Sequence, residues 1–135
     1  MHIIHKAAGI LIKDRKLLVE KSHNKQIFIA PGGSIEVWET PKMALARELL
    51  EEFQIHTKEE DFQEFGVFEA KAAGQEDKMV IMNVFLVTQR EWEPTPDNEV
   101  ETILWVSSRI PDDIQIGSIF LHEVIPKLKE MDLID

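Results

Sequence analysis

The sequence predicts an α/β protein, in which a mixed β-sheet carries helices on its faces. Two observations predict it. Apolar segments of strand length precede and follow one long helical segment, and a second helical segment ends the chain. The 135 residues also suffice for one sizeable hydrophobic core, so we expect a single domain spanning 1-135.

The first third of the chain is predicted to be strands and turns. Residues 3–12 and 16–20 are rich in apolar residues and flank a polar turn at residues 13–15, which is typical of two paired strands. Residues 22–26 are a polar loop, and residues 26–30 a short strand that ends at Pro31. Gly32 and Gly33 follow, where the backbone is free to approach a ligand closely.

Residues 41–53 are predicted to form the central helix. Thr40 is a good N-cap, and Pro41 suits the first helical position because its missing N–H has no partner there. At about 100° per residue, three carboxylates fall within one arc of the helix, which we expect to be a separate face from the core. The carboxylates are Glu48, Glu51 and Glu52, and the expected core face comprises Ala46, Leu49, Leu50 and Phe53.

The second half of the chain is predicted to add three strands and a helix. The strands are expected at residues 62–70, 79–87 and 101–106, with loops at 72–77 and 89–98. Residues 118–131 have helical periodicity, with Ile119, Val124, Leu128 and Met131 near one face. Pro126 lies inside this segment and predicts a kink or a late helix start.

Residues 33–55 carry the most specific pattern in the chain. They match the spacing G-x5-E-x7-R-E-U-x-E-E-x-G-U, where U is aliphatic, at every specified position except the last glycine, which is Gln54. A chance match at one start position is well below about one in a million. The segment therefore resembles the Nudix box. The matching residues are Gly33, Glu39, Arg47, Glu48, Leu49, Glu51, Glu52 and Ile55.

The resemblance implies the α/β/α sandwich of the Nudix family and a divalent cation. Hard carboxylate oxygens suit Mg²⁺, with Mn²⁺ as the alternative, and crowded carboxylates repel one another unless a cation joins them. The metal ligands implied are Glu48, Glu51, Glu52 and the carbonyl of Gly32. Arg47 is expected to orient a glutamate through a bidentate pair and is also a candidate for substrate binding.

The family hydrolyses nucleoside diphosphates linked to another group, so a nucleophilic water and a general base are needed. Glu48 and Glu52 are the catalytic candidates within the box. The base is a box glutamate or one on a later loop, where Glu99 is favoured over Glu101 and Glu76.

The substrate class is narrowed by absent features. A tyrosine beyond the box often accompanies diadenosine polyphosphates, and a proline soon after it often accompanies ADP-ribose. This chain has no tyrosine and no proline between Pro41 and Pro94. We therefore expect a MutT-like nucleoside triphosphate pyrophosphohydrolase. Two alternatives stay open: an ADP-ribose or nucleotide-sugar pyrophosphatase, and a catalytically weak nucleotide-sensing or partner-binding module.

Further substrate contacts are less specific. Lys6 and Lys21 are candidates for phosphate contacts, against the alternative of solvated lysines. Trp38, in the loop before Glu39, and Trp92 are candidates for stacking on a base, although packing is the commoner role for tryptophan.

The composition indicates which classes of binding partner and which cellular compartment to expect. The net charge of −10 argues against binding to a nucleic-acid backbone but not against a small nucleotide held through a cation. No apolar run reaches transmembrane length, and the absence of cysteine fits a reducing cytoplasm. We expect a cytoplasmic monomer or homodimer that acts on a free nucleotide, with neither nucleic acid nor membrane as a partner.

Overall fold

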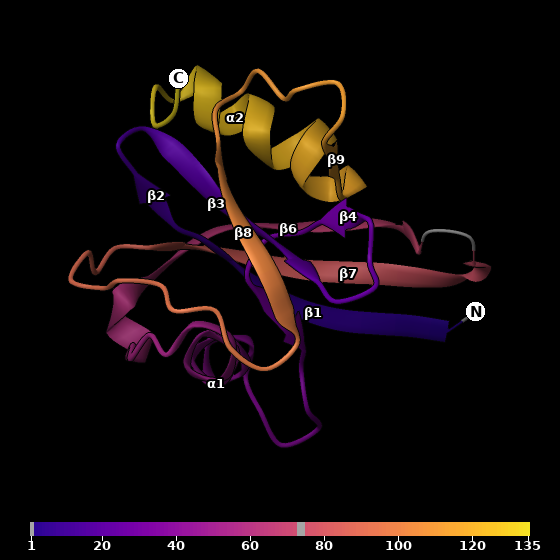
Figure 1. Ribbon diagram of the computed structural model, residues 1–135. Coiled ribbons are helices and arrows are strands. Elements are labelled where there is room, and N and C mark those ends of the chain that lie inside the picture. Colours follow the sequence, from indigo (N-terminus) through magenta and orange to yellow (C-terminus); the bar gives the residue numbers. More distant parts are fainter. Residues whose placement is uncertain (1, 73–74) are drawn as a thin grey trace.

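The computed structural model describes residues 2–72 and 75–135 as strands flanked by helices (Figure 1). The strands are β1 (His2–Ile10), β2 (Ile12–Lys13), β3 (Lys16–Ser22), β4 (Ile27–Phe28), β5 (Gly32–Ser34), β6 (Phe62–Ala72), β7 (Gln75–Val87), β8 (Val100–Val106) and β9 (Gln115–Ile116). The helices are α1 (Pro41–Phe53), the 3₁₀ turn η1 (Glu59–Asp61), the π turn η2 (Phe120–Val124) and α2 (Ile125–Glu130).

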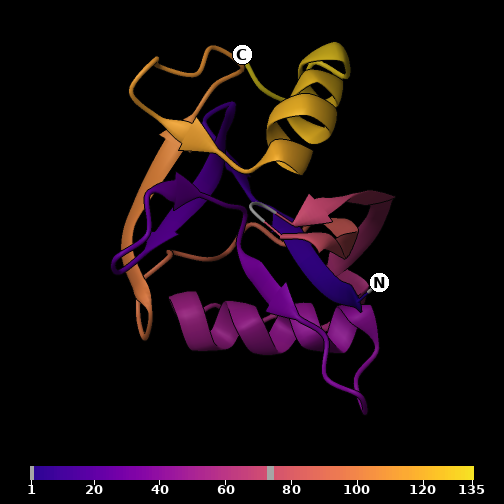
Figure 2. The same ribbon diagram turned by 90° about the vertical axis from the view of Figure 1, so that its right-hand side faces the viewer.

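The strands form a mixed arrangement. The largest sheet has the order β5-β1-β7-β6, in which β1 and β7 are parallel and the other pairs antiparallel. Strands β2, β3 and β8 form an antiparallel sheet, and β4 pairs with β9 in parallel. Helix α1 lies on one side of the strands and α2 on the other (Figures 1 and 2). This architecture confirms the predicted α/β/α sandwich.

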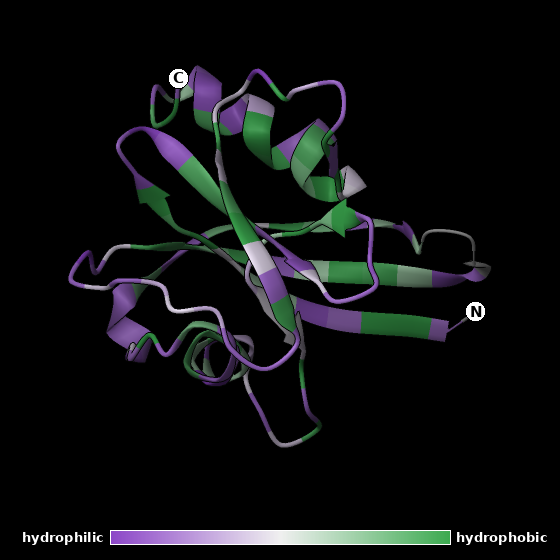
Figure 3. Cartoon of the chain, in the orientation of Figure 1, coloured by the Kyte–Doolittle hydropathy of each residue, from purple (hydrophilic) through white to green (hydrophobic). Residues whose placement is uncertain are grey.

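Two apolar clusters lie between the strands and the helices, one on each side. Figure 3 shows that the strands between the two helices are rich in hydrophobic residues. The α2-side cluster packs η2 and α2 against the strands through residues such as Val19, Val124 and Leu128. The α1-side cluster packs Leu45, Leu49 and Phe53 of α1, among others, against the opposite side. Each helix is therefore held by an apolar face of its own.

Strand β3 contributes to both clusters by alternation. Leu17 and Val19 belong to the α2-side cluster, whereas Leu18 belongs to the α1-side cluster. Because side chains on a strand alternate between its faces, the next residue on the α1 side is Glu20. Its relative exposure is 0%.

The central helix begins as predicted, but its two faces differ from the prediction. Thr40 accepts a hydrogen bond from Met43 N at 3.2 Å, and Pro41 opens the helix. Leu50, predicted to be core, is exposed, and Ala46 is only partly buried. The buried residues are Ala44, Leu45, Leu49 and Phe53.

The expectation of a separate carboxylate face was wrong for a geometric reason. At about 100° per residue, Glu48 and Glu52 project within the same arc as Ala44, Leu45 and Leu49. Only Glu51 lies toward the outside, with its side chain 50% exposed. Two of the three carboxylates therefore face into the molecule.

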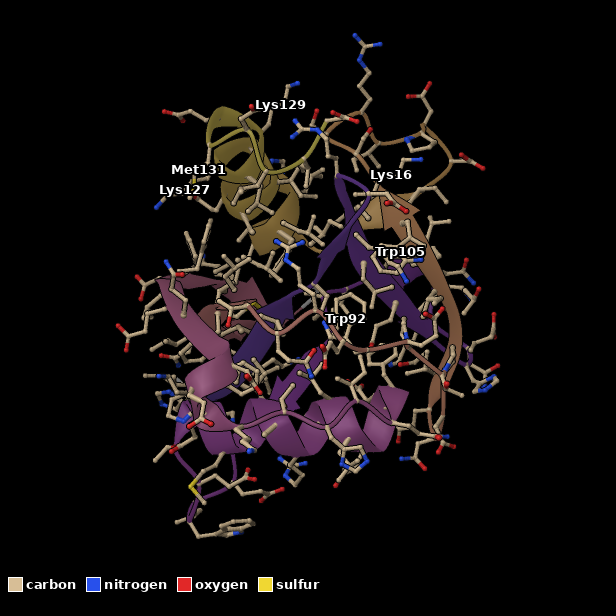
Figure 4. The ribbon with its side chains drawn as sticks, turned by 90° about the vertical axis from the view of Figure 1, so that its left-hand side faces the viewer. Lys16, Trp92, Trp105, Lys127, Lys129 and Met131 are labelled. Carbon is tan, nitrogen blue, oxygen red and sulfur yellow. The ribbon has the colours of Figure 1, made fainter. Side chains whose placement is uncertain are left out.

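The C-terminal helix runs from Ser118 through α2, and Pro126 neither breaks it nor delays its start. Instead the preceding turn widens into η2, in which Ile125 N donates to Phe120 O. A wide turn makes room for a proline ring that would clash with the carbonyl four residues before it. Met131, predicted to lie near one helix face with Ile119, Val124 and Leu128, follows the helix end and is exposed (Figure 4).

The other predicted strands are present, with shifted bounds. The segment 3–12 is two strands with a break at Leu11, and the turn of Asp14 and Arg15 has positive φ angles of 52° and 62°. Strands β6 and β7 extend into the predicted 72–77 loop, of which Ala73 and Gly74 lie outside the described residues. Strand β9 was not predicted. No described helix is long and apolar enough to cross a membrane.

Candidate active site

The glycine pair brings the backbone of β5 against α1. Gly32 has a φ of +145°, and a Cβ there would lie 2.0 Å from the carbonyl oxygen of Ala7 on the paired strand β1. No side chain fits this position. Its N–H donates to Glu52 Oε1 at 3.2 Å, so the close approach also anchors a carboxylate of the helix.

Gly33 makes room for a second carboxylate. A Cβ on Gly33 would lie 2.6 Å from the Glu48 carboxyl carbon. The two glycines thus form a backbone cradle in which Glu48 and Glu52 lie against β5. A side chain at Gly33 would push the Glu48 carboxylate away from it.

Arg47 ties the loop after β5 to the helix. Its guanidinium donates two hydrogen bonds to Glu39, at 2.7 and 2.9 Å, and a third to the Ser34 carbonyl at 3.1 Å. It also donates to Glu48 at 2.9 Å. The predicted bidentate pair is therefore present, with Glu39 as the partner. These partners occupy the guanidinium, so its geometry is that of a positioning residue.

The positive charge of Arg47 is paired with the carboxylates of Glu39 and Glu48. Its hydrogen bonds lower the pKa of Glu39, whose side chain is only 1% exposed. Burial raises the pKa of Glu48, and the hydrogen bond from Arg47 opposes that rise. Arg47 therefore favours the ionised form of both box carboxylates, whereas burial disfavours it.

Glu20 of β3 and Glu52 of α1 form a buried pair of carboxyl groups. Burial raises the pKa of Glu20 to about 10, and the charges of Glu52 and Glu48 add to the rise. Burial also raises the pKa of Glu52 to about 7. In the described part of the chain no donor reaches either oxygen of Glu20. The two groups lie close enough for a protonated Glu20 to donate to Glu52.

The donor set fits a hard divalent cation. The cradle offers carboxylate oxygens, and beside it the two buried oxygens of Glu20 accept no hydrogen bond from the described residues. Within residues 2–72 and 75–135, however, no three acidic or histidine side chains converge into a preformed metal site. Glu48 is turned toward Arg47, and Glu51 extends outward. Binding a cation would require these two side chains to rotate.

The loop before β8 closes the end of the helix. Asp97 N donates to Glu52 O at 2.8 Å, and the Asn98 side chain donates to Glu51 O at 2.7 Å. Gln54 takes the left-handed conformation, with φ 58° and ψ 32°, and its side chain donates to Asp97 at 3.3 Å. Gln54 thus forms the left-handed cap in the place of the glycine that the box specifies. The glutamates precede it and stay in place.

The structure separates several predicted contacts from the cradle. Lys21, a candidate for phosphate contact, forms an ion pair at 2.6 Å with Glu101, a candidate general base, so the two side chains engage each other. Glu99 is exposed, and no hydrogen bond or ion pair joins its side chain to the described part of α1. The side chain of Glu76 lies outside the described residues. Lys6 lies on β1 opposite Ser34 of β5, beside the glycine pair.

The tryptophans divide into one exposed ring and one stacked pair. Trp38 is 68% exposed in the loop between β5 and α1, so packing is not its role. Trp92 and Trp105 stack with centroids 6.2 Å apart and an interplanar angle of 4° (Figure 4). Trp105 also lines an open cavity of about 380 Å³ near Lys13 and Lys16. None of the box residues lines that cavity.

Glu20 is the site residue that sequence reasoning missed. A signal was present, because Leu18 and Glu20 share one face of a strand whose neighbours are apolar. A glutamate at the end of an apolar strand is usually its exposed boundary, and we placed the strand end there. Only the pairing of Glu20 with Ile29 on one side and Ile103 on the other makes it interior.

Comparison with known proteins agrees with this geometry. A family model of the NUDIX domain matches residues 3–117. No curated protein matches the chain by sequence. Solved structures do match it in fold, at sequence identities that establish likeness of fold alone.

Three of these structures illustrate the degree of similarity in fold. The E. coli ORF135 protein, solved in solution, has a TM-score of 0.73 at 21% identity, over 97% of this chain and 94% of that one. The MutT protein from Methanosarcina mazei Go1 has a TM-score of 0.74 at 17% identity, over 97% and 96%. A bifunctional NMN adenylyltransferase/ADP ribose pyrophosphatase from Francisella tularensis, complexed with AMP and a manganese ion, has 0.65 at 17%, over 95% and 41%.

Proposed function

The chain belongs to the Nudix family and is a Nudix pyrophosphohydrolase, and on that premise we propose that it hydrolyses nucleoside triphosphates with the help of Mg²⁺ or Mn²⁺. The observation that carries the proposal is the cradle, where β5 and α1 bring box carboxylates against a backbone that only glycine permits. Glu48, Glu51, Glu52 and the Gly32 carbonyl would hold the cation. When bound, it would neutralise phosphate oxygens and lower the pKa of a bound water.

The chain's own residues have distinct tasks in this proposal. Arg47 donates to Glu39 and to the Ser34 carbonyl, and so keeps the loop after β5 closed against the helix. The Gly32 N–H donates to Glu52 Oε1 and so holds this carboxylate in the cradle. Glu52 is our first choice for the general base, because its carboxylate lies in the cradle, anchored by the Gly32 N–H. Glu48 and Glu99 are the alternatives.

The substrate preference is supported by sequence and fold together. The tyrosine and proline that accompany other substrate classes are absent. MutT proteins are among the similar structures, and so is a chain whose second activity is that of an ADP ribose pyrophosphatase. A net charge of −10 favours a free nucleotide over a nucleic acid. ADP-ribose is therefore the competing substrate to test.

Steady-state kinetics on a nucleotide panel test the proposal. We expect kcat/KM for at least one nucleoside triphosphate to exceed that for ADP-ribose, with pyrophosphate as a product. A clear advantage for ADP-ribose would overturn the substrate assignment and leave the enzyme class intact. No turnover of any nucleotide would instead favour a nucleotide-sensing module.

A further inference from the structure

Glu20 is a buried carboxyl group whose position is fixed on both sides. Its backbone N–H donates to Ile29 O, and its carbonyl accepts from Ile29 N, both at 2.8 Å. On the other side β3 pairs with β8, where Ile103 is its partner. The strand therefore cannot turn this side chain to solvent without losing hydrogen bonds, and its exposure is 0%.

The surroundings of Glu20 are acidic. It points to the same side as Leu18, toward α1, where Glu52 and Glu48 are its charged neighbours. In the described residues no lysine, arginine or histidine forms an ion pair with Glu20 or Glu52. Arg47 reaches Glu48 only from the opposite side, next to Glu39 and Glu51.

Such an arrangement is costly unless a positive group completes it. A buried carboxyl group loses its hydration, and a proton shared between Glu20 and Glu52 offsets only part of that loss. An apolar residue in place of Glu20 would extend the contact that Leu18 already makes, so stability does not account for a glutamate here. A buried carboxyl group that meets a box glutamate from a second element is, in contrast, a pair of oxygen ligands that suits a hard cation.

We propose that Glu20 is an additional ligand of the divalent cation, which is thereby held between strand β3 and helix α1. The inference rests on the proposed function, because it concerns the same site. The box alone would attach the cation to α1 and β5. With Glu20 a carboxylate from a third element joins it, and cation binding links β3 to the helix directly.

Direct binding of Mn²⁺ tests this inference without any substrate. Titration calorimetry on the metal-free protein would compare native protein with Glu20→Gln, Glu52→Gln and Glu69→Gln. Glu69 is an exposed carboxylate on β6 and controls for the loss of one charge. We expect Glu20→Gln to weaken Mn²⁺ binding by at least about tenfold, Glu52→Gln to weaken it likewise, and Glu69→Gln to leave it unchanged.

The outcomes separate this inference from the function it rests on. Native affinity in Glu20→Gln, with weakened binding in Glu52→Gln, would overturn the role of Glu20 and leave the proposed function standing. Native affinity in both variants would overturn the cation site itself. If Glu20→Gln does not fold, Glu20→Asp replaces it, since its carboxylate is withdrawn by one methylene. Weaker Mn²⁺ binding by Glu20→Asp is then expected, and native affinity would contradict the inference.

Discussion

The two sides of the sheet bury different kinds of side chain. On the α2 side the buried residues are apolar, with Val19, Val124 and Leu128 fully enclosed. On the α1 side an apolar cluster of similar make-up adjoins Glu20, Glu39 and Glu48, whose side chains are nearly or largely buried. Both sides are held by hydrophobic burial, but only the α1 side also carries the cost of desolvated charge.

The contrast indicates a division of labour across the sheet. The α2 side contributes stability, whereas the α1 side gives up some stability to place carboxylates against a glycine backbone. Strand β3 belongs to both sides, since Val19 faces the α2 side and the adjacent Glu20 faces the α1 side. Substitutions on the two sides should therefore affect different measurements.

The largest expected effect is on turnover, from Glu52→Gln on the α1 side. Gln keeps the shape of the side chain but removes its charge and basicity, so kcat should fall by orders of magnitude while the fold persists. Turnover is measured with a nucleoside triphosphate and Mg²⁺, and folding by circular dichroism. Near-native turnover in this variant would remove Glu52 from the catalytic group.

The matching substitution on the α2 side is Leu128→Ala. Leu128 is 0% exposed, and its truncation should lower the free energy of unfolding by about 2–5 kcal/mol. Urea denaturation measures this loss. The kcat of the folded variant should remain close to native, and a collapse of kcat at full folding would break the proposed division.

The sequence reveals the features that depend on neighbouring residues, but not those that depend on residues far apart in the chain. Thr40 and Pro41 are local signals, and they located the start of α1 correctly. The spacing of the box identified the family. Glu20 depends instead on which strands flank β3, and the pairing of Lys21 with Glu101 joins residues 80 positions apart. No local pattern contains such information.

Pro126 and Gln54 are intermediate cases. The sequence indicated an irregularity at Pro126, and the structure has it in the preceding π turn, whose Phe120 and Val124 are buried. For Gln54 the sequence showed only that the last glycine of the box is absent. In the structure its left-handed cap lies next to the loop before β8, where Asp97 accepts from the Gln54 side chain and Asn98 donates to the helix end.

A third expected effect concerns pH in the absence of divalent cations. The folded protein keeps a proton on Glu20 up to about pH 10, whereas the unfolded chain releases it in the ordinary glutamate range. Unfolding therefore releases a proton, and the free energy of unfolding should fall as pH rises through this window. Urea denaturation with a chelator at about pH 6 and about pH 8.5 measures the slope.

The control for this slope is Glu20→Gln, which carries no titrating group at that position. Its free energy of unfolding should decline less steeply with pH than that of the native protein. Equal slopes would mean that Glu20 does not carry the buried proton. Glu52, with a pKa raised to about 7, contributes in the same direction in both proteins.

The smallest expected effect is that of Gln54→Gly. Glycine tolerates a φ of 58° without the penalty of a Cβ, so the variant should be more stable by roughly 0.5–1 kcal/mol. Thermal denaturation measures the gain, and Mn²⁺ affinity should stay unchanged. A large gain in affinity would show that Gln54 impairs the cation site and would favour the binding-module alternative.

The central claim is that the α1-side carboxylates serve a cation-dependent hydrolysis of nucleoside triphosphates. The most direct measurement is pyrophosphate release by the native protein with Mg²⁺ added, after chelation, and after Mg²⁺ is restored. The account predicts turnover with the cation, none with the chelator, and recovery on restoration. Equal turnover in the presence of the chelator, or none at any concentration of Mg²⁺ or Mn²⁺, would contradict it.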